Sequence, residues 1–485
     1  MKHIQVWLLL VLAAMSSALA QPMVAQPDEN VIRGIEALAE EYAGIAQQIW
    51  EYAEVGYLET RSSELLQSTL RNAGFAVEAG VAGMPTAFVG TYGSGEPIIG
   101  ILAEFDALPG ISQDRVPERQ TIDDKGAGHA CGHHLFGTAS VASAIAVKEW
   151  LDRSGTSGTI RLYGTPAEEG GAGKVYMVRE GLFDDVDAVL HWHAGDRNSA
   201  SASSSLANKS AKFRFHGLSA HAAGAPERGR SALDGVEAMN AMVNMLREHV
   251  PQETRIHYVI TSGGAAPNVV PDFAEVYYYV RNPDPNNVVA IFDRVVKAAQ
   301  GAALGTETRM EFEVVHGIYA LLPNETLARR MYESLERVGG VEYTEKERQF
   351  GEVLQQSFTN DVLPLSSAAE VQEFYVTDEG SGGSTDVGDV SWVVPTAGLR
   401  TATWVPGTPA HSWQAIAAGG TSIGNKGMIV AAKTLTLTAI DVFSDPQIVQ
   451  DAHRERERRV GPDFVYESLV GDRLPPLDYR KPATP

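Results

Sequence analysis

The sequence predicts an α/β protein: a mixed, mostly parallel sheet covered by helices, with a separate α+β unit inserted into it. Short apolar runs at residues 98–103, 159–163 and 188–192 each end in a polar or glycine-rich loop, and a helical pattern over 137–151 lies between the first two. Strands that alternate with helices favour a parallel sheet, with the ligand site at the carboxyl ends of the strands.

A different order of elements begins near Lys209. We expect strands over 211–215, 255–261, 273–281 and 310–315, and helices over 231–247 and 285–300. This βαββαβ order suggests a sandwich with its own core. It predicts an inserted dimerisation or lid domain at residues 209–318, between two parts of a catalytic domain at 21–208 and 319–445.

The two ends of the chain differ from its middle. Lys2, an apolar run over residues 6–15 and the small residues Ala18 and Ala20 are typical of a signal peptide, residues 1–20. The run is shorter than the roughly 20 residues that span a bilayer, so we expect cleavage and export to the periplasm or medium, without a membrane partner. The tail, residues 446–485, is rich in charge and proline and is expected to be a surface arm.

The net charge bears on the class of partner, and the cysteine content bears on disulfide formation. The 485 residues carry a formal net charge of −22, which argues against a nucleic-acid partner and favours a small-molecule ligand. Cys131 is the single cysteine, so this sequence cannot form an internal disulfide.

Cys131 lies in the run Gly128-His129-Ala130-Cys131-Gly132-His133-His134. One cysteine among histidines suits a catalytic metal centre with open positions, because a structural zinc site normally uses four protein ligands. The alternative is that Cys131 is a small buried apolar residue and the histidines cap a helix.

Two adjacent acids, Glu168 and Glu169, follow the strand over 159–163. One carboxylate can hold a metal while its neighbour moves the proton of a water molecule. The alternative is a helix whose first turn is enriched in glutamate.

Further histidines could complete such a site. His191 and His193 alternate along an expected strand and point to one face, and His193 is preferred as the ligand because it lies nearer the strand end. His411 lies in a proline-containing loop, where a lone histidine indicates little by itself.

Seven motifs, in order along the chain, resemble a metallopeptidase and amidohydrolase family. That family includes aminoacylase, carboxypeptidase G, hippurate hydrolases and the hydrolases of indole-acetyl amino acids. The motifs are Glu54-Val55-Gly56-Tyr57, Glu104-Phe105-Asp106-Ala107-Leu108-Pro109, His129-Ala130-Cys131-Gly132-His133, Thr165-Pro166-Ala167-Glu168-Glu169-Gly170, Ser219-Ala220-His221-Ala222-Ala223, Ala266-Pro267-Asn268-Val269-Val270-Pro271 and Thr408-Pro409-Ala410-His411-Ser412.

The resemblance implies a centre of two divalent metal ions, Mn or Zn, bridged by Cys131 and completed by His133, Glu169, His193 and His411. It makes Glu168 the general base and Asp106 a residue that orients a ligand histidine. It also implies that His221 enters the active site of a partner subunit and that Asn268 and Arg281 hold a substrate carboxylate. These roles come from the resemblance.

The activity implied is hydrolysis of the amide bond of an N-acyl amino acid, by a homodimer or with a related subunit. A dipeptidase or metallocarboxypeptidase on the same site, and a non-catalytic periplasmic binding protein, are the alternatives. Three features depart from the family pattern. His134 stands where relatives usually have Asp, His191 is an unexpected alternative to His193, and Asp386 lies in a segment that is less acidic than in many relatives.

Overall fold

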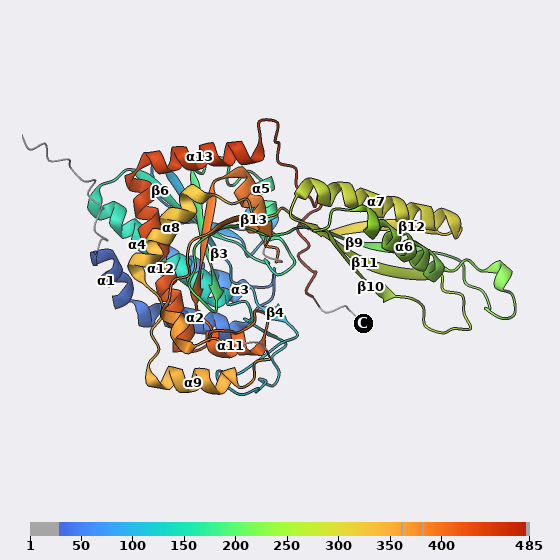
Figure 1. The fold of residues 1–485 in the computed structure, drawn as a ribbon, viewed down its shortest axis with the longest axis horizontal. Coiled ribbons are helices and arrows are strands. Elements are labelled where there is room, and N and C mark those ends of the chain that lie inside the picture. Colours follow the sequence, from blue (N-terminus) through green and yellow to red (C-terminus); the bar gives the residue numbers. More distant parts are fainter. Residues whose placement is uncertain (1–28, 360–361, 381–382, 482–485) are drawn as a thin grey trace, which may run out of the picture.

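A mixed six-stranded sheet organises the larger lobe of the protein (Figure 1). The computed structural model describes residues 29–359, 362–380 and 383–481, so the predicted signal peptide lies outside the described residues. The strand order is β1-β2-β6-β3-β7-β14, in which β6, β3, β7 and β14 are parallel to one another and β1 and β2 add an antiparallel edge. The bounds are β1 (Ala76–Ala79), β2 (Phe88–Ser94), β3 (Ile98–Ala103), β6 (Gly158–Gly164), β7 (Ala188–Gly195) and β14 (Thr396–Ala402).

Helices cover this sheet, as its sequence pattern predicts. Residues 99–103 of β3 are continuously buried, which requires cover on both faces of the strand. Helices α4 and α12 pack against each other and against the parallel strands. The helices of this lobe are α1 (Glu29–Ala37), α2 (Ala39–Tyr52), α3 (Thr60–Asn72), α4 (His133–Ser154), α5 (Gly173–Arg179), α8 (Glu325–Val338), α9 (Glu345–Gln355), α10 (Val387–Val393), α11 (Trp413–Gly419), α12 (Ser422–Ser444) and α13 (Pro446–Val460). Two short strand pairs join loops: β4 (Leu108–Pro109) with β5 (Ala127–Gly128), and β8 (Ala202–Ser204) with β13 (Val376–Gly380).

Helix α12 is apolar along most of its length. Among the described residues it is the one helix long and apolar enough to cross a membrane, but 72% of its most apolar window is buried inside the fold. Its apolar side chains are accounted for by its packing against α4 and α8.

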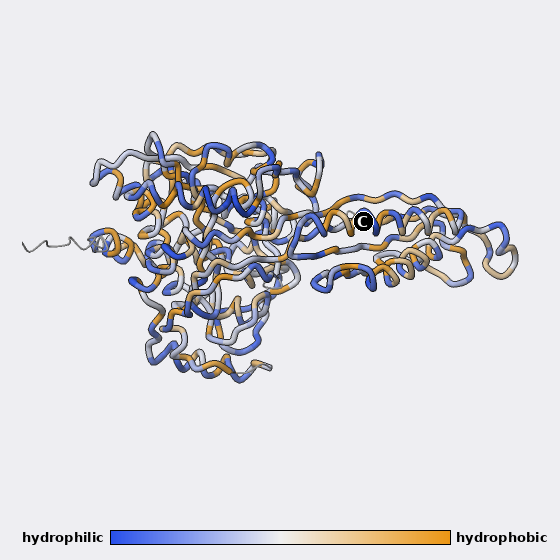
Figure 2. Tube along the Cα trace, turned by 45° about the horizontal axis from the view of Figure 1, so that its top comes forward, coloured by the Kyte–Doolittle hydropathy of each residue, from blue (hydrophilic) through white to orange (hydrophobic). Residues whose placement is uncertain are grey.

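The inserted domain has the predicted βαββαβ order. Its antiparallel sheet has the order β10-β11-β9-β12, and it has its own apolar core. Figure 2 shows it extending from the larger lobe as a long arm. Its elements are β9 (Ala207–His216), α6 (Ala232–Leu246), β10 (Arg255–Ser262), β11 (Phe273–Asn282), α7 (Pro285–Gly305) and β12 (Arg309–Ile318).

The tail after Asp445 is more ordered than the expected surface arm. It begins with helix α13, where Asp445 accepts a hydrogen bond from the backbone N–H of Gln447. Ile448, Ala452 and Glu455 are buried at helical spacing, and the Glu455 carboxylate accepts hydrogen bonds from the first backbone N–H groups of α8. This amphipathic pattern lies within a charge-rich sequence, which explains why composition alone predicted an arm.

We expect Gly164→Ala to destabilise the protein by about 1–3 kcal/mol, the usual cost of overpacking a core. Gly164 ends β6, and a Cβ there would lie 2.1 Å from the ring of the fully buried Phe88. Gly44→Ala in α2 is the control, because its Cβ would meet nothing within 4 Å and should stabilise the helix by about 0.5–1 kcal/mol. Thermal unfolding of the two variants beside the parent checks this. An unfolding temperature for Gly164→Ala equal to that of the parent would contradict it.

Candidate metal centre

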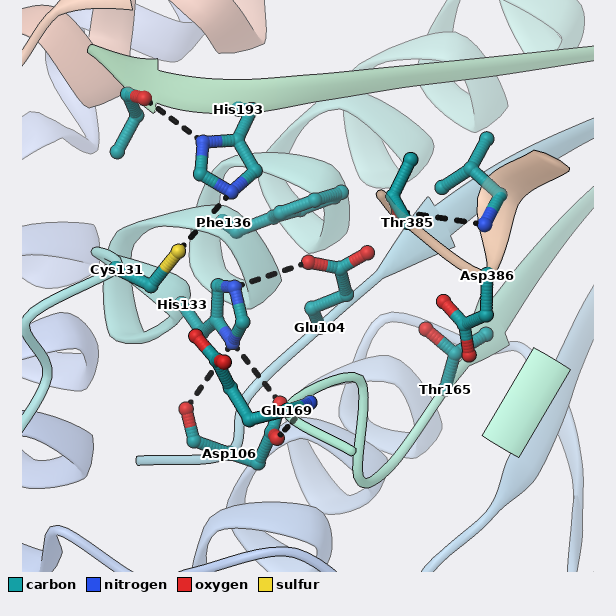
Figure 3. A network of polar contacts seen from close by, with 12 residues as sticks. Glu104, Asp106, Cys131, His133, Phe136, Thr165, Glu169, His193, Thr385 and Asp386 are labelled. Atoms are coloured by element: carbon teal, nitrogen blue, oxygen red, sulfur yellow. Dashed lines mark hydrogen bonds and ion pairs between the residues drawn. The ribbon is translucent and has the colours of Figure 1, made fainter. Parts of the chain in front are cut away.

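The predicted ligands lie together at the carboxyl ends of the parallel strands. Glu169 follows β6, His193 lies near the end of β7, and His411 follows β14. The ligand atoms of Cys131, His133 and His193 all lie within 4.8 Å of one another, and so do those of Cys131, Glu169 and His411. Cys131 belongs to both groups, which is the arrangement that a bridging ligand requires. Figure 3 shows Cys131 with His133, His193 and Glu169.

Asp106 joins two of the motifs. Its Oδ1 lies 2.9 Å from Nδ1 of His133, and its Oδ2 accepts a hydrogen bond of 2.9 Å from the backbone N–H of Glu169. With Nδ1 held in this way, Nε2 of His133 is left to face the centre. This is the geometry of a residue that orients a ligand histidine.

The two histidines of β7 differ in their surroundings. His193 Nδ1 donates to the carbonyl oxygen of Ala194 at 2.8 Å, and its Nε2 lies 3.3 Å from the Cys131 sulfur. His191 lies against Gly398 of β14, where an added Cβ would be 2.2 Å from its Nε2. Burial, with Lys174 nearby, lowers the pKa of His191 to about 3. The geometry favours His193 over His191 as a ligand.

His411 reaches the centre from a backbone conformation that few non-glycine residues adopt. Its φ is +58°, and its backbone N–H donates to the carbonyl oxygen of Ala130 at 3.0 Å. Its Nε2 lies 3.2 Å from Oε1 of Glu169. The adjacent Cys131 and Glu169 raise the pKa of His411 to about 10.

A left-handed backbone conformation at Ala167 sets the direction of the Glu168 and Glu169 side chains. Its φ is +59°, a strain of about 1–3 kcal/mol that surrounding contacts must offset. The Glu59 carboxylate accepts the Ala167 N–H at 2.9 Å, and the Ala167 carbonyl accepts the Gly171 N–H at 2.9 Å. Burial and the charge of Asp106 raise the pKa of Glu59 to about 8.

Glu168 has the electrostatic surroundings of a proton carrier. Burial raises its pKa well above the usual value of a glutamate, and the nearby carboxylates of Glu104 and Glu169 raise it further. A general base is most effective when its pKa lies near the working pH.

A buried ion-pair network, which no sequence pattern indicated, lies behind the centre. Lys174 is fully buried, and its Nζ lies 2.7 Å from Glu104 and 2.7 Å from Asp386. Glu104 in turn reaches Nε2 of His133 at 3.1 Å. Asp386 therefore acts on the centre through Lys174 and is absent from the ligand groups found among the described residues. No charge periodicity marks Lys174, which follows a run of glycines and alanine.

His134 points away from the centre. Its Nε2 lies 3.0 Å from the carbonyl oxygen of Gly419, and burial lowers its pKa to about 3. In this chain His134 therefore ties α4 to the end of α11.

The unsatisfied atoms of the site fit a metal centre. Glu104 Oε2, His133 Nε2 and Glu169 Oε1 are buried. Glu104 Oε2 lies 3.1 Å from His133 Nε2, and Glu169 Oε1 lies 3.2 Å from His411 Nε2, but none of the three atoms has the geometry of a hydrogen bond to any described residue. Leaving buried polar atoms unpaired costs free energy, and such atoms in native structures call for an unseen partner such as an ion. The sulfur, imidazole and carboxylate donors are those of a divalent transition metal.

The three residues predicted to act on substrate are separated. His221 is exposed and, with Asn268, lies beyond the far end of β9, where Ala222 N–H donates to the Asn268 carbonyl. The inserted domain extends away from the larger lobe (Figure 1), and a ten-residue strand spans about 33 Å, so His221 lies far from its own metal centre. Arg281 is the next-to-last residue of β11 and lies beside the larger lobe, where its Nη1 donates to Ser384 at 3.4 Å.

Comparisons with known proteins agree with this architecture. The model of peptidase family M20/M25/M40 matches residues 100–357. One of the subunits of the p-aminobenzoyl-glutamate hydrolase of Escherichia coli is 43% identical over 87% of this chain and 93% of its own, and a mouse Xaa-Arg dipeptidase is 28% identical over 87% and 90%. A dinuclear metal binding peptidase of the M20 family from Bacillus subtilis has the same fold, with a TM-score of 0.58 at 18% identity over 84% of this chain and 99% of that one.

We expect Lys174→Met to cost about 3–5 kcal/mol of stability in the metal-free protein, because it leaves Glu104 and Asp386 buried without their cation. Lys148→Met is the control, since Lys148 pairs with Asp152 at the surface of α4 and such pairs contribute at most about 1 kcal/mol. Thermal unfolding compares the two variants. Equal shifts would show that the buried network does not stabilise the fold.

Proposed function

Because the chain belongs to peptidase family M20/M25/M40, we propose that it is a metal-dependent hydrolase that cleaves the amide bond of an N-acyl amino acid. The observation that carries this proposal is the pair of ligand groups sharing Cys131, with the Glu168 carboxylate beside them. The Escherichia coli relative is named for p-aminobenzoyl-glutamate, so we propose a substrate of that type.

We propose that two divalent ions, Mn or Zn, occupy these groups. Cys131, His133 and His193 would hold one, and Cys131, Glu169 and His411 the other. When bound, the ions would polarise the substrate carbonyl and acidify a water molecule. The name of the dinuclear relative from Bacillus subtilis supports a count of two.

Glu168 then carries the proton between the two halves of the reaction. Its carboxylate takes a proton from the attacking water, whose oxygen bonds to the carbonyl carbon. Glu168 returns that proton to the nitrogen as the C–N bond breaks, which yields a carboxylic acid and an amine. Glu168 can carry the proton because its carboxylate lies within 4.8 Å of ligand atoms of Glu104 and His133, beside the proposed ions.

We propose that substrate binding is divided between two copies of the chain. Arg281 of one subunit and Asn268 of its partner can bind the substrate carboxylate, while His221 of the partner reaches the centre and stabilises the developing oxyanion. Four exposed apolar side chains support a two-fold contact along edge strand β10 and helix α6: Met242, Met245, Val259 and Ile260. The Escherichia coli relative is named as one component of a hydrolase with more than one kind of subunit, so a related chain is the alternative partner.

The location of the protein is also a proposal. The pattern of residues 1–20 supports export to the periplasm or the medium.

We expect Glu168→Gln to lower kcat by about 10²- to 10⁴-fold while metal content stays at the parental level, because the amide cannot accept a proton. Glu169→Gln is the comparison and should lose metal. Elemental analysis is combined with hydrolysis of p-aminobenzoyl-glutamate, other N-acyl amino acids and dipeptides.

The same experiment separates the alternatives. Turnover of dipeptides alone would identify a dipeptidase. Bound metal without turnover of any substrate would identify a binding protein. Loss of metal from Glu168→Gln would make Glu168 a ligand rather than the base.

We expect inactive Glu168→Gln and His221→Ala chains to restore each other when co-expressed. In a mixed dimer one site has both substitutions and the other has neither, so the randomly paired mixture should give about a quarter of parental activity and purified mixed dimers about half. Activity of purified mixed dimers, formed from differently tagged chains, checks this. Mixed dimers without activity would place His221 in its own subunit's site or outside catalysis.

A further inference from the structure

The described end of the chain returns to the candidate metal centre. After α13 the tail passes between the two lobes, seen in dark red in Figure 1. Leu469 and Val470 are buried on this path. Arg473 pairs with Glu313 of β12 at 2.9 Å, and its backbone carbonyl accepts from Arg179 of α5 at 2.6 Å. The tail is therefore anchored to both lobes before it reaches the site.

Tyr479 and Arg480 contact the backbone of a predicted ligand. Tyr479 Oη and Arg480 Nη2 donate to the carbonyl oxygen of Glu169 at 3.0 and 2.6 Å. On the other side, the Glu169 N–H donates to Asp106. Both peptide groups that flank the Glu169 Cα are held, so the two soft dihedrals of this residue are fixed. The Arg480 contact is charge-assisted and therefore stronger than a neutral hydrogen bond.

The Tyr479 side chain packs between Gly56 and the ring of Tyr57. A Cβ on Gly56 would lie 2.3 Å from its hydroxyl, so the absence of a side chain there makes room for it. The rings of Tyr57 and Tyr479 meet edge to face, with centroids 5.7 Å apart. The Tyr57 hydroxyl donates to the carbonyl of Gly171 at 2.8 Å. The two tyrosines thus donate to two carbonyl oxygens of the turn over residues 168–171, those of Glu169 and Gly171.

We propose that Tyr479 and Arg480 are positioning residues that fix the turn carrying Glu168 and Glu169, and thereby set the affinity of the centre for divalent ions. The inference rests on the proposed function, in which Glu169 is a ligand. The turn is outside any helix or strand, so its geometry depends on these side-chain contacts. Outer contacts of this kind contribute to metal affinity because they orient the ligand before the ion arrives.

The test measures metal binding by the metal-free full chain. We expect the double variant Tyr479→Phe with Arg480→Gln to weaken binding of Zn²⁺ and Mn²⁺ by about 10- to 100-fold in a chelator competition. Its kcat should fall at limiting metal, while KM stays within about twofold, because neither side chain is placed on the substrate. Lys481→Ala is the control, since Lys481 is the exposed next residue. Parental metal affinity in the double variant would overturn the proposal.

Two further comparisons of variants distinguish the remaining outcomes. If the double variant unfolds, Arg480→Lys and Arg480→Gln are compared: restored affinity with Lys alone supports the proposal, and parental affinity in both overturns it. Glu169→Ala separates the inference from the proposed function. Unchanged metal binding in Glu169→Ala shows that the ligand assignment itself is wrong. Weakened binding in Glu169→Ala, with parental binding in the tail variants, overturns the role of the tail alone.

Discussion

Repulsion among carboxylates is the constraint on which the candidate centre depends. Five of them meet at the carboxyl edge of the parallel strands: Glu104, Asp106, Glu168, Glu169 and Asp386. Burial raises the pKa of Glu168, and the like charges of Glu104, Glu169 and Asp386 raise it further, because like charges in a buried site disfavour one another's ionised forms. Lys174 compensates part of this charge. The remainder makes the site favourable for cations, so the proposed metal binding and the proposed proton transfer would have the same electrostatic origin.

Backbone geometry brings these carboxylates together, at the cost of local backbone strain. The parallel strands end at one edge, and chemistry-bearing residues follow them directly. Ala167 and His411 adopt positive φ so that their loops turn toward Cys131. The backbone N–H of each strained residue donates to an oxygen from a distant part of the chain, on Glu59 or Ala130. The motifs that are far apart in sequence are therefore interdependent in structure.

Most of the fold follows from local sequence patterns. The apolar runs predicted β3, β6 and β7, and the βαββαβ order predicted the inserted domain, because strand and helix periodicities are local properties. The position of Cys131 between glycines and histidines likewise indicated a metal site. The resemblance supplied the assignment of ligands, which the geometry favours but which stays a prediction.

The features that the sequence did not predict depend on contacts between segments that are far apart in the chain. Lys174 meets Asp386 across 212 residues, and no pattern near either one indicates the pair. The many charged residues of α13 mask, at the level of sequence, the helical spacing of the buried residues Ile448 and Ala452. The contact of Tyr479 with the Glu169 backbone spans 310 residues and depends on the path of the whole tail.

That path has a consequence for biosynthesis. A chain emerges with its N-terminus first, from the ribosome or, for the export proposed above, on the far side of the membrane, and its domains generally fold as they emerge. The sheet, Cys131 and the inserted domain all emerge before residues 461–481. The space beside Gly56 is not filled until Tyr479 has emerged. An incomplete chain therefore contains the predicted ligand residues before it can form the contacts that fix Glu169. Order of synthesis thus separates the folding of the lobes from the completion of the centre.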